Sequence, residues 1–175
     1  MAAVFAATIA GCAADEPAQD TPRPTRTTLG LFSSAFLDGS TIPARYTCDG
    51  ENVSPPLAWS RVPARARSLA LTVEDQDAPT GAFLHWSVYD LPRGSSGLST
   101  GRVLPDAAEG ENSSGTSGYD GPCPPKGDDA HRYRFRLYAL DAELGLPPGA
   151  APDPVREAIA RHAITNGTLT GRYRR

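Results

Sequence analysis

Residues 68–91 read SLALTVEDQDAPTGAFLHWSVYDL, and they decide the fold that we predict for this chain. From Ser68 to Glu74, apolar residues alternate with smaller or polar ones, which is typical of a β-strand with one apolar face. A second run of strand-forming residues, Leu84 to Leu91, follows after a short polar segment. We therefore expect two neighbouring strands that pair with each other.

Polar groups gather where the first of these strands ends and the second begins. Asp75, Asp77 and Pro79 follow the first strand, and His85 stands near the start of the second. Strict alternation along the second strand predicts that His85 lies on the more polar face, opposite Trp86. Two acids, a proline and a histidine at the mouth of a hairpin indicate a small polar site on a β scaffold.

The composition is that of a single soluble domain. The chain has 175 residues, of which 39% are hydrophobic and 21% charged, and its formal net charge is −3. This length suits one domain with one substantial core, and the missing basic footprint gives no reason to expect nucleic acid as a partner. The 17 glycines and 17 prolines favour many short strands joined by loops over a helical bundle.

The chain starts with an alanine-rich apolar segment that leads into Ile9-Ala10-Gly11-Cys12. This tetrapeptide resembles the lipobox of bacterial lipoproteins, so we predict a signal segment over residues 1–12 and lipidation of Cys12. The protein would then be exported to a bacterial cell envelope and anchored to a membrane by its lipid. The segment is too short for a membrane-spanning helix. It lacks a basic start, so two alternatives stay open: the true start lies upstream, or the alanine-rich run is a coincidence.

Residues 13–28 read AADEPAQDTPRPTRTT and contain no large apolar side chain. Such a segment cannot bury a core, and we predict a flexible tether that holds the domain away from a membrane surface. The folded domain is expected over residues 29–175.

The remaining two cysteines form an even pair if Cys12 is lipidated. In an oxidising compartment we expect a disulfide between Cys48 and Cys123. It would close a loop of roughly 75 residues, worth on the order of 4–5 kcal/mol in the chain-entropy model. The alternative is two free thiols.

Strand-like runs and loops rich in glycine and proline alternate along the rest of the domain. Asp153-Pro154 is typical of a helix start, with Asp153 as N-cap and Pro154 at the first helical position. A Pro-Pro pair favours an edge position for the extended segment 54–59. The predicted elements are an imperfect strand at 29–36, the edge segment, strands at 68–74 and 84–91, a long loop at 94–121, a strand at 131–140, a helix from 153 to Asn166-Gly167 and a final strand at 168–173.

The long loop and the strand after it carry further candidate groups. The loop leads into Gly118 to Pro125, where glycines let backbone N–H groups converge as in anion-binding nests. In the strand 131–140, His131 and Tyr133 share one face and three arginines share the other. We interpret the arginine stripe as a solvated face paired with acids, rather than as a phosphate or membrane patch.

In this order, the segments resemble the phosphatidylethanolamine-binding protein (PEBP) family, and within it the bacterial Raf-kinase-inhibitor-like group. The resemblance runs from about Leu29 to Arg174. The motifs that carry it are Ile42-Pro43 with Tyr46-Thr47-Cys48-Asp49-Gly50, Ser54-Pro55-Pro56-Leu57 with Trp59, Asp75-Gln76-Asp77-Ala78-Pro79, His85-Trp86, Gly121-Pro122-Cys123-Pro124-Pro125 and His131-Arg132-Tyr133.

The resemblance implies a mainly β fold, a PEBP-like β-sandwich with a large antiparallel sheet, a smaller sheet and a short C-terminal helix. It also implies a small anion pocket near the surface that takes phosphate, phosphorylated small molecules or phospholipid head groups. Gln76 stands where the family usually has proline, which loosens the turn without removing a carboxylate. The ligand-binding residues implied by motif are Asp75, Asp77, Pro79, His85, Gly121, His131 and Tyr133.

Three classes of function compete. A lipid-anchored binding protein for small anions fits the resemblance best, and an inhibitor of a protease or kinase is the alternative. A weak metal-dependent or acid/base hydrolase is a third reading, but the chain lacks His-x-x-x-His, Cys-x-x-Cys and Gly-x-Ser-x-Gly patterns. We therefore expect no enzyme, no catalytic residue, no metal and no cofactor. A structural alternative also stays open, in which Asp75 and Asp77 cap a turn and His131 is a satisfied core histidine; so does a homodimer, because some bacterial relatives look dimeric.

Overall fold

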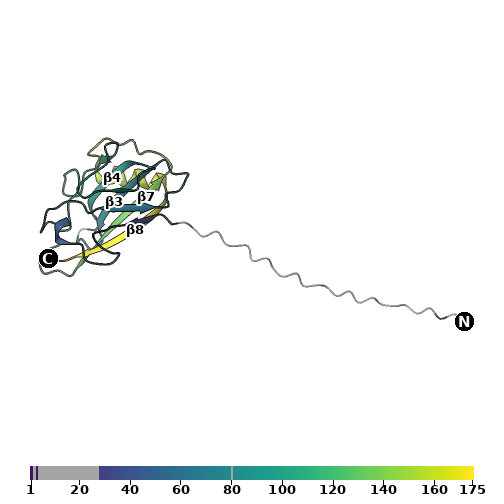
Figure 1. The fold of residues 1–175 in the computed structure, drawn as a ribbon, viewed down its shortest axis with the longest axis horizontal. Helices are drawn as coiled ribbons and strands as arrows, with labels where there is room; N and C mark the ends of the chain where they lie inside the picture. Colours follow the sequence, from purple (N-terminus) through teal and green to yellow (C-terminus); the bar gives the residue numbers. More distant parts are fainter. Residues whose placement is uncertain (2, 4–27, 80) are drawn as a thin grey trace.

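The computed structural model describes residues 1, 3, 28–79 and 81–175 (Figure 1). Residues 4–27 lie outside the described residues. They include Cys12 and most of the predicted signal segment and tether. From Gly30 onward the chain forms two antiparallel sheets, one short 3₁₀ turn and one α-helix. This confirms the predicted mainly β fold with a large sheet, a smaller sheet and a short C-terminal helix.

The two sheets differ in size, and all their strand pairs are antiparallel. The larger has the order β6-β4-β3-β7-β8 and consists of β6 (Ala108–Glu109), β4 (Phe83–Pro92), β3 (Ser68–Asp75), β7 (His131–Leu140) and β8 (Ala163–Tyr173). The smaller has the order β1-β2-β5 and consists of β1 (Gly30–Phe32), β2 (Leu57–Ser60) and β5 (Gly97–Leu98). The 3₁₀ turn is η1 (Ala44–Tyr46) and the helix is α1 (Pro152–His162).

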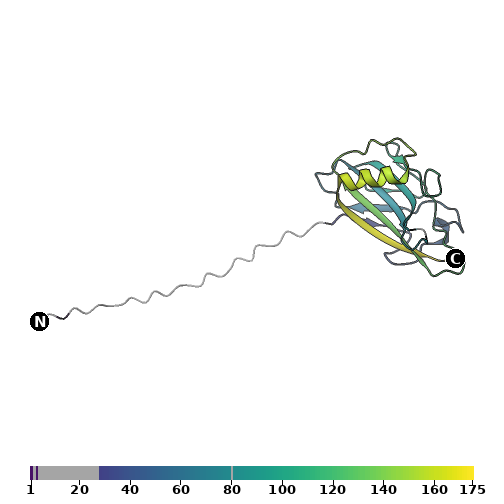
Figure 2. The ribbon, with the colours of Figure 1, turned by 180° about the vertical axis from the view of Figure 1, so that it is seen from behind.

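The large sheet is covered on both faces, because α1 lies across the face that is turned away from the small sheet (Figure 2). On β3, Leu71 and Val73 pack into the main core with side chains of the small sheet. Ala70 points to the other face and packs against Val155 and Ile159 of α1. Burying a valine or isoleucine side chain contributes roughly 1.5–3 kcal/mol, so these contacts hold the helix on the sheet.

The end of the helix and the start of the last strand differ from the prediction. The helix begins at Pro152 with Ala151 as N-cap, two residues earlier than predicted, and ends at His162. The strand β8 follows at once, so the predicted helix end at Asn166-Gly167 is wrong. Pairing with β7 along its full length outweighs the local turn signal of that dipeptide. The glycine at 167 has a packing reason instead, since an added Cβ would lie 2.3 Å from the backbone oxygen of Leu29.

The predicted disulfide between Cys48 and Cys123 is confirmed. It joins the turn after η1 to the proline-rich segment before β7, across 75 positions of the sequence. The backbone N–H of Cys48 also donates to the oxygen of Pro122, at 3.2 Å. These two links fix the proline-rich segment against the turn.

The long loop between β4 and β7 is ordered by its own hydrogen bonds. It contains the short strands β5 and β6, and Asn112, which is 2% exposed, organises the turn that follows β6. The Asn112 side chain accepts from the backbone N–H groups of Ser114 and Thr116 and donates to the oxygen of Gly118. The turn therefore delivers the segment after Gly118 to the end of the large sheet.

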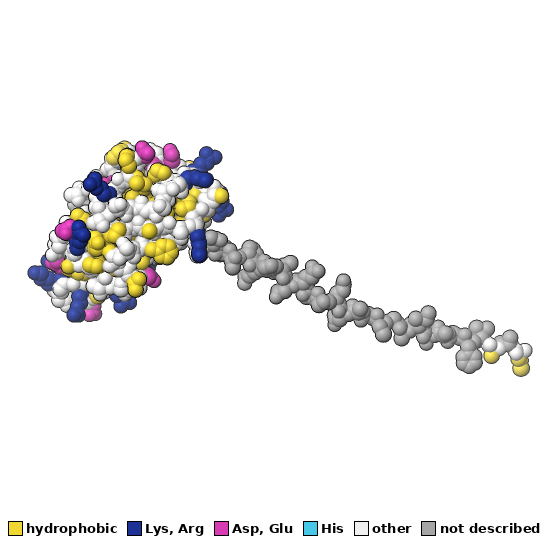
Figure 3. Space-filling model, in the orientation of Figure 1, with side chains coloured by type: hydrophobic (Ala, Val, Ile, Leu, Met, Phe, Trp, Pro, Cys, Tyr) yellow, Lys and Arg dark blue, Asp and Glu magenta, His cyan; other side chains and the backbone are white. Residues whose placement is uncertain are grey.

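Basic side chains are dispersed over the face shown in Figure 3, mostly towards its edge, with hydrophobic side chains in separate patches between them. Of the arginines on β7, Arg132 pairs with Asp77, whereas Arg136 donates to the hydroxyl of Tyr138 and lies against its ring. The predicted pairing of the arginine stripe with acids is therefore confirmed for Arg132 only. Among the described residues, no acid forms an ion pair with Arg134 or Arg136.

Candidate functional site

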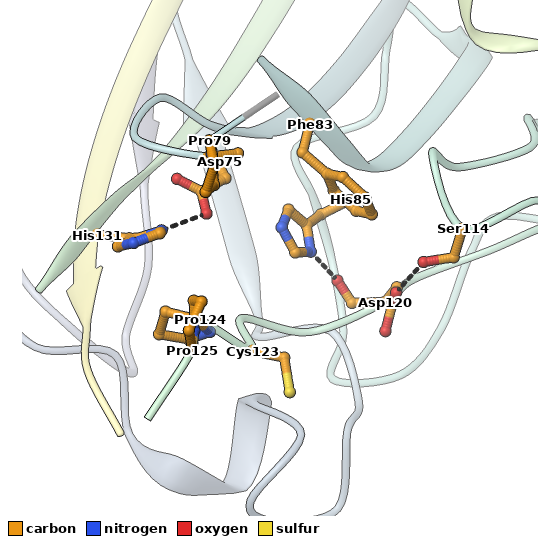
Figure 4. A pocket seen from close by; sticks show the side chains of 11 residues that line it. Asp75, Pro79, Phe83, His85, Ser114, Asp120, Cys123, Pro124, Pro125 and His131 are labelled. Carbon is orange, nitrogen blue, oxygen red and sulfur yellow. Dashed lines mark hydrogen bonds and ion pairs between the residues drawn. The ribbon is translucent and has the colours of Figure 1, made fainter. Parts of the chain in front are cut away.

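A cavity of about 280 Å³ lies at the end of the large sheet where β3 stops and β4 and β7 begin (Figure 4). Four of the predicted ligand-binding residues line it: Asp75, Pro79, His85 and His131. The rest of the wall includes Phe83, Ser114, Asp120 and the segment 123–125, which contains one half of the disulfide.

Sheet register brings the polar groups of three strands together. Asp75, the last residue of β3, stands opposite Phe83 of β4 and Tyr133 of β7. His131 is the first residue of β7, two positions before Tyr133 and therefore on the same face. The cavity is thus built where the ends of three adjacent strands meet.

A β-bulge aims His85 into the cavity. On β3, Val73 stands opposite Trp86 and Glu74 opposite Leu84, so His85 is an extra residue of β4 with no counterpart. Such an insertion locally breaks the alternation of side chains and often re-aims one of them near a functional site.

The bulge overturns the predicted facing of His85. Its ring meets the edge of the Tyr133 ring, with 5.3 Å between centroids, and lies 4.8 Å from the ring of Phe83. Tyr133 belongs to the same core cluster as Trp86. His85 therefore lies on the same side of the sheet as Trp86, and the prediction that it lies opposite Trp86 is wrong.

Asp75 and His131 form a buried pair at one side of the cavity. The Nδ1–H of His131 donates to Oδ2 of Asp75 at 2.7 Å, and the other oxygen accepts the backbone N–H of Asp77 at 2.9 Å. Asp75 is 4% exposed and His131 6%. Both oxygens of the buried carboxylate are hydrogen-bonded, as such groups require, and the histidine ring is fixed in orientation. Its Nε2 lies 3.9 Å from a carboxylate oxygen of the more exposed Asp128.

His85 faces this pair from the other side of the cavity (Figure 4). Its Nδ1 lies 2.7 Å from the backbone oxygen of Asp120. Because a carbonyl oxygen only accepts, Nδ1 carries the proton in the neutral ring and Nε2 is left as an acceptor. Burial lowers the pKa of His85, against the opposing effect of the Asp120 carbonyl and charge. The ring is therefore neutral near pH 7.

The other three predicted residues support the cavity from outside its wall. Asp77 accepts hydrogen bonds from the backbone and guanidinium of Arg132, and the guanidinium lowers the pKa of Asp77 to about 2. The Gly121 N–H donates to the side-chain oxygen of Asn52 at 2.8 Å. That N–H is therefore already paired within the protein and is not one of the free donors of the predicted nest.

The Tyr133 ring lies close to both histidines of the cavity, with its centroid 5.3 Å from that of His85 and 6.5 Å from that of His131. Its ring is fully buried, and its hydroxyl has no hydrogen-bond partner among the described residues. Burial raises the pKa of Tyr133, and the nearby carboxylate of Asp75 adds to that rise. The hydroxyl is therefore a neutral donor close to the buried carboxylate.

The wall contains residues that the motif analysis did not single out. Phe83 follows from its place two residues before His85, but Ser114 and Asp120 come from the long loop, which has no periodicity. The Ser114 hydroxyl donates to the Asp120 carboxylate at 2.8 Å, which braces the loop beside His85. Among the described residues, no group of three or more His, Cys, Asp or Glu side chains is arranged to hold a metal ion.

Comparison with known proteins identifies the family. A family model described as phosphatidylethanolamine-binding protein matches residues 32–174. The chain belongs to the PEBP family. Among PEBP structures, that of a predicted homologue from Chlamydia trachomatis is 41% identical with a TM-score of 0.79, and it covers 85% of this chain and 98% of its own. Escherichia coli YbcL, described as a new member of the mammalian PEBP family, is 28% identical with a TM-score of 0.81, over 84% of this chain and 98% of its own.

Curated relatives extend the PEBP match. A UPF0098 protein from Methanothermobacter thermautotrophicus is 49% identical over 152 residues, which are 84% of this chain and 99% of the relative. The predicted lipoprotein LppC from Mycobacterium tuberculosis is 43% identical over 153 residues, which are 87% of this chain and 76% of LppC. No helix among the described residues has the length and apolar character to cross a membrane.

Proposed function

We propose that this PEBP-family protein is an exported, lipid-anchored binding protein whose cavity takes small anions: phosphate, phosphorylated small molecules or phospholipid head groups. One observation carries the proposal: two buried imidazoles, those of His85 and His131, face each other across a cavity of about 280 Å³. This volume lies just below the range of roughly 300–1,000 Å³ that holds drug-sized ligands, which suits one phosphate group.

The hydrogen bonds around the cavity support an anion despite its carboxylates. Asp75 already accepts two hydrogen bonds, one of them from His131, so its carboxylate is stabilised by donors within the protein. His85 directs an unprotonated Nε2 towards the ligand space, and an anion there stabilises the imidazolium form of that ring. Binding is therefore coupled to protonation of His85 at Nε2. The proton comes either from solvent or from an O–H group of the bound phosphate.

Export and anchoring rest on a separate set of observations. Cys12 ends a lipobox-like sequence, the Cys48–Cys123 bridge is typical of oxidising compartments, and LppC is a relative with a lipoprotein name. We expect the full chain to fractionate with membranes in a bacterial host that processes lipoproteins, and Cys12→Ser to release it into the soluble fraction. Equal membrane association of both forms would count against the anchor.

The three histidines of the chain make the anion test direct. We expect phosphate and phosphoethanolamine to shift the ring signals of His85 and His131 in NMR spectra, with saturation in the millimolar range. His162 is the internal control, because it ends α1 and is not part of the cavity lining. Its half-buried ring pairs with Asp141.

Three outcomes oppose the anion proposal: no shift at tens of millimolar phosphate, equal shifts of all three histidines, or unchanged binding after His85→Ala. The first two would show that the cavity does not select the anion. The third would place the anion elsewhere on the molecule. Circular dichroism of the His85→Ala variant tests that it is still folded.

A further inference from the structure

A second cavity, of about 250 Å³, lies next to the anion cavity. Both cavities are lined by the end of the long loop, since Tyr119 lines the second cavity and Asp120, the next residue, lines the first. Two neighbouring residues of β4 also line different cavities: His85 lines the first and Trp86 lines the second. The second cavity has one carboxylate in its wall, that of Glu109, and neither lysine nor arginine.

The Glu109 carboxylate is held in a fixed position. Its Oε1 accepts the indole N–H of Trp86 at 2.7 Å. Trp86 is 1% exposed, and its ring meets the Tyr119 ring edge-on with 5.5 Å between centroids. Among the residues that the structure describes, Glu109 takes part in no ion pair, and no side chain donates to its Oε2.

We propose that this second cavity binds a cation with N–H donors, namely a primary ammonium or a guanidinium on a short apolar stem. The free Oε2 and the remaining lone pairs of Glu109 accept charge-assisted hydrogen bonds from such a group. Val53 and Val103 supply an apolar wall for the stem. The cavity lies below the range of roughly 300–1,000 Å³ that holds drug-sized ligands, so the ligand is a small amine or a single side chain.

A purely structural role explains Glu109 less well. The buried indole N–H of Trp86 needs an acceptor, but a neutral amide or carbonyl would satisfy it. A half-buried carboxylate without a counter-charge is costly to desolvate, and a bound cation removes that cost. The backbone also leaves room for one: at Gly118 an added Cβ would lie 3.6 Å and 3.8 Å from the two oxygens of Glu109, so any side chain there would cover the carboxylate.

The test uses the two indole N–H signals of the chain. We expect n-butylamine and methylguanidinium to shift the Trp86 indole signal saturably in NMR spectra. The Trp59 indole donates to the oxygen of Ser95 at 2.7 Å, away from this cavity, and is expected to stay fixed. His85 ring signals are also expected to stay fixed, which separates this proposal from the anion site and lets either fail alone.

Glu109→Gln is the decisive variant, because its amide oxygen still accepts the Trp86 N–H while the charge is lost. We expect it to weaken amine binding by at least about tenfold, as the loss of a hydrogen bond to a charged group does. Glu111→Gln removes the same charge two residues away, outside the cavity lining, and is expected to leave binding unchanged.

Two probes separate the sources of such a cation, a free amine and a protein side chain. Tighter binding of Nα-acetyl-lysine methylamide or its arginine counterpart supports a bound peptide, and preference for the simple amines supports a free metabolite. If about 100 mM amine causes no saturable shift of the Trp86 signal, the proposal is overturned, because specific binding ordinarily saturates at far lower concentrations. Amine binding by Glu109→Gln as tight as that of the wild type also overturns it.

Discussion

At the scale of single residues, His85 determines how the proposed anion site responds to pH. Its Nδ1–H is engaged by the Asp120 carbonyl, and burial lowers its pKa in the anion-free protein. An anion at Nε2 favours the protonated ring and raises that pKa. The complex therefore holds more protons than its separate components at pH values between the two pKa values, and affinity rises as pH falls through that window.

Sulfate tests this linkage, because its own charge is constant over the range in which histidines titrate. We expect its affinity, measured by calorimetry, to rise by up to about tenfold per pH unit as pH falls from 8 towards 5. His85→Gln is expected to flatten this dependence, and His162→Gln to leave it intact. The other charged groups around the cavity remain in both variants, so equal slopes in His85→Gln and the wild type would contradict the assignment to His85.

The ion pair of Asp77 with Arg132 makes a second pH-dependent contribution, this time to stability. Arg132 lowers the pKa of Asp77 to about 2, below the ordinary aspartate value. A depressed carboxyl pKa stabilises the fold above the unfolded value of about 3.9, and this contribution is lost as pH falls towards 2. Since the Arg132 side chain is 52% exposed, solvent screening limits the pair to about 1 kcal/mol.

Asp77→Asn is expected to lower the free energy of unfolding at pH 7 by about 0.5–1 kcal/mol. The deficit should shrink as pH falls from 4 to 2, because the wild-type carboxylate is then protonated as well. Urea denaturation at several pH values measures it. Asp153→Asn is the matched control, since this exposed acid forms only a surface pair with Arg156. A constant deficit from pH 7 to pH 2 would assign the effect to the turn rather than to the charge.

At the scale of elements, periodicity predicted the strands that alternate without interruption. The runs at 68–74 and 131–140 became β3 and β7, whose register places Asp75 next to His131. The sequence also predicted β4 as a strand. Its bulge at His85 could not be predicted, because it depends on the pairing with β3 and leaves no signal in the sequence of β4 alone. The Asn166-Gly167 signal failed for a similar reason, because long-range pairing with β7 outweighed a local turn preference.

The β1–β8 contact supplies a prediction at this scale. An alanine at 167 would place its Cβ 2.3 Å from the backbone oxygen of Leu29, so the start of β1 has to move away from β8. We expect Gly167→Ala to lower the free energy of unfolding by about 1–3 kcal/mol, the usual cost of overpacking. Urea denaturation measures it.

Gly94→Ala is the matched control for this change. Its added Cβ meets nothing within 4 Å, and its backbone φ is not positive. An exposed substitution of this kind is expected to change stability by less than about 0.5 kcal/mol. Similar destabilisation by both substitutions would mean that loss of glycine, and not the contact with Leu29, causes the effect.

At the scale of the whole molecule, contacts between distant parts of the chain hold the loop segments of the cavity wall in place. Cys123 is bridged to Cys48, and Asp49 accepts from the hydroxyl of Tyr173 and the guanidinium of Arg175 at the end of β8. The sequence predicted the disulfide by counting cysteines and the pocket by its motifs. Ser114 was not predicted, and the segment that contains Asp120 was singled out for its backbone N–H groups and not for this carboxylate; the positions of both side chains depend on hydrogen bonds within an aperiodic segment.

Removing the disulfide tests whether this tie serves the site as well as the fold. The chain-entropy model gives about 4–5 kcal/mol for a loop of this length, and measured losses are typically about 2–5 kcal/mol. We expect the double variant Cys48→Ser/Cys123→Ser to lose stability within that range in urea denaturation. Because Cys123 and its neighbouring prolines form part of the cavity wall, we also expect it to bind phosphate more weakly.

The control is a reductant. Dithiothreitol should bring the wild type to the stability and phosphate affinity of the double variant and should leave the variant itself unchanged. Full phosphate affinity in a folded, bridge-free protein would show that hydrogen bonds such as that from Cys48 to Pro122 hold the wall on their own. In that case the bridge contributes to the fold alone, and the site's integrity rests on the contacts of Asp49 with the end of β8.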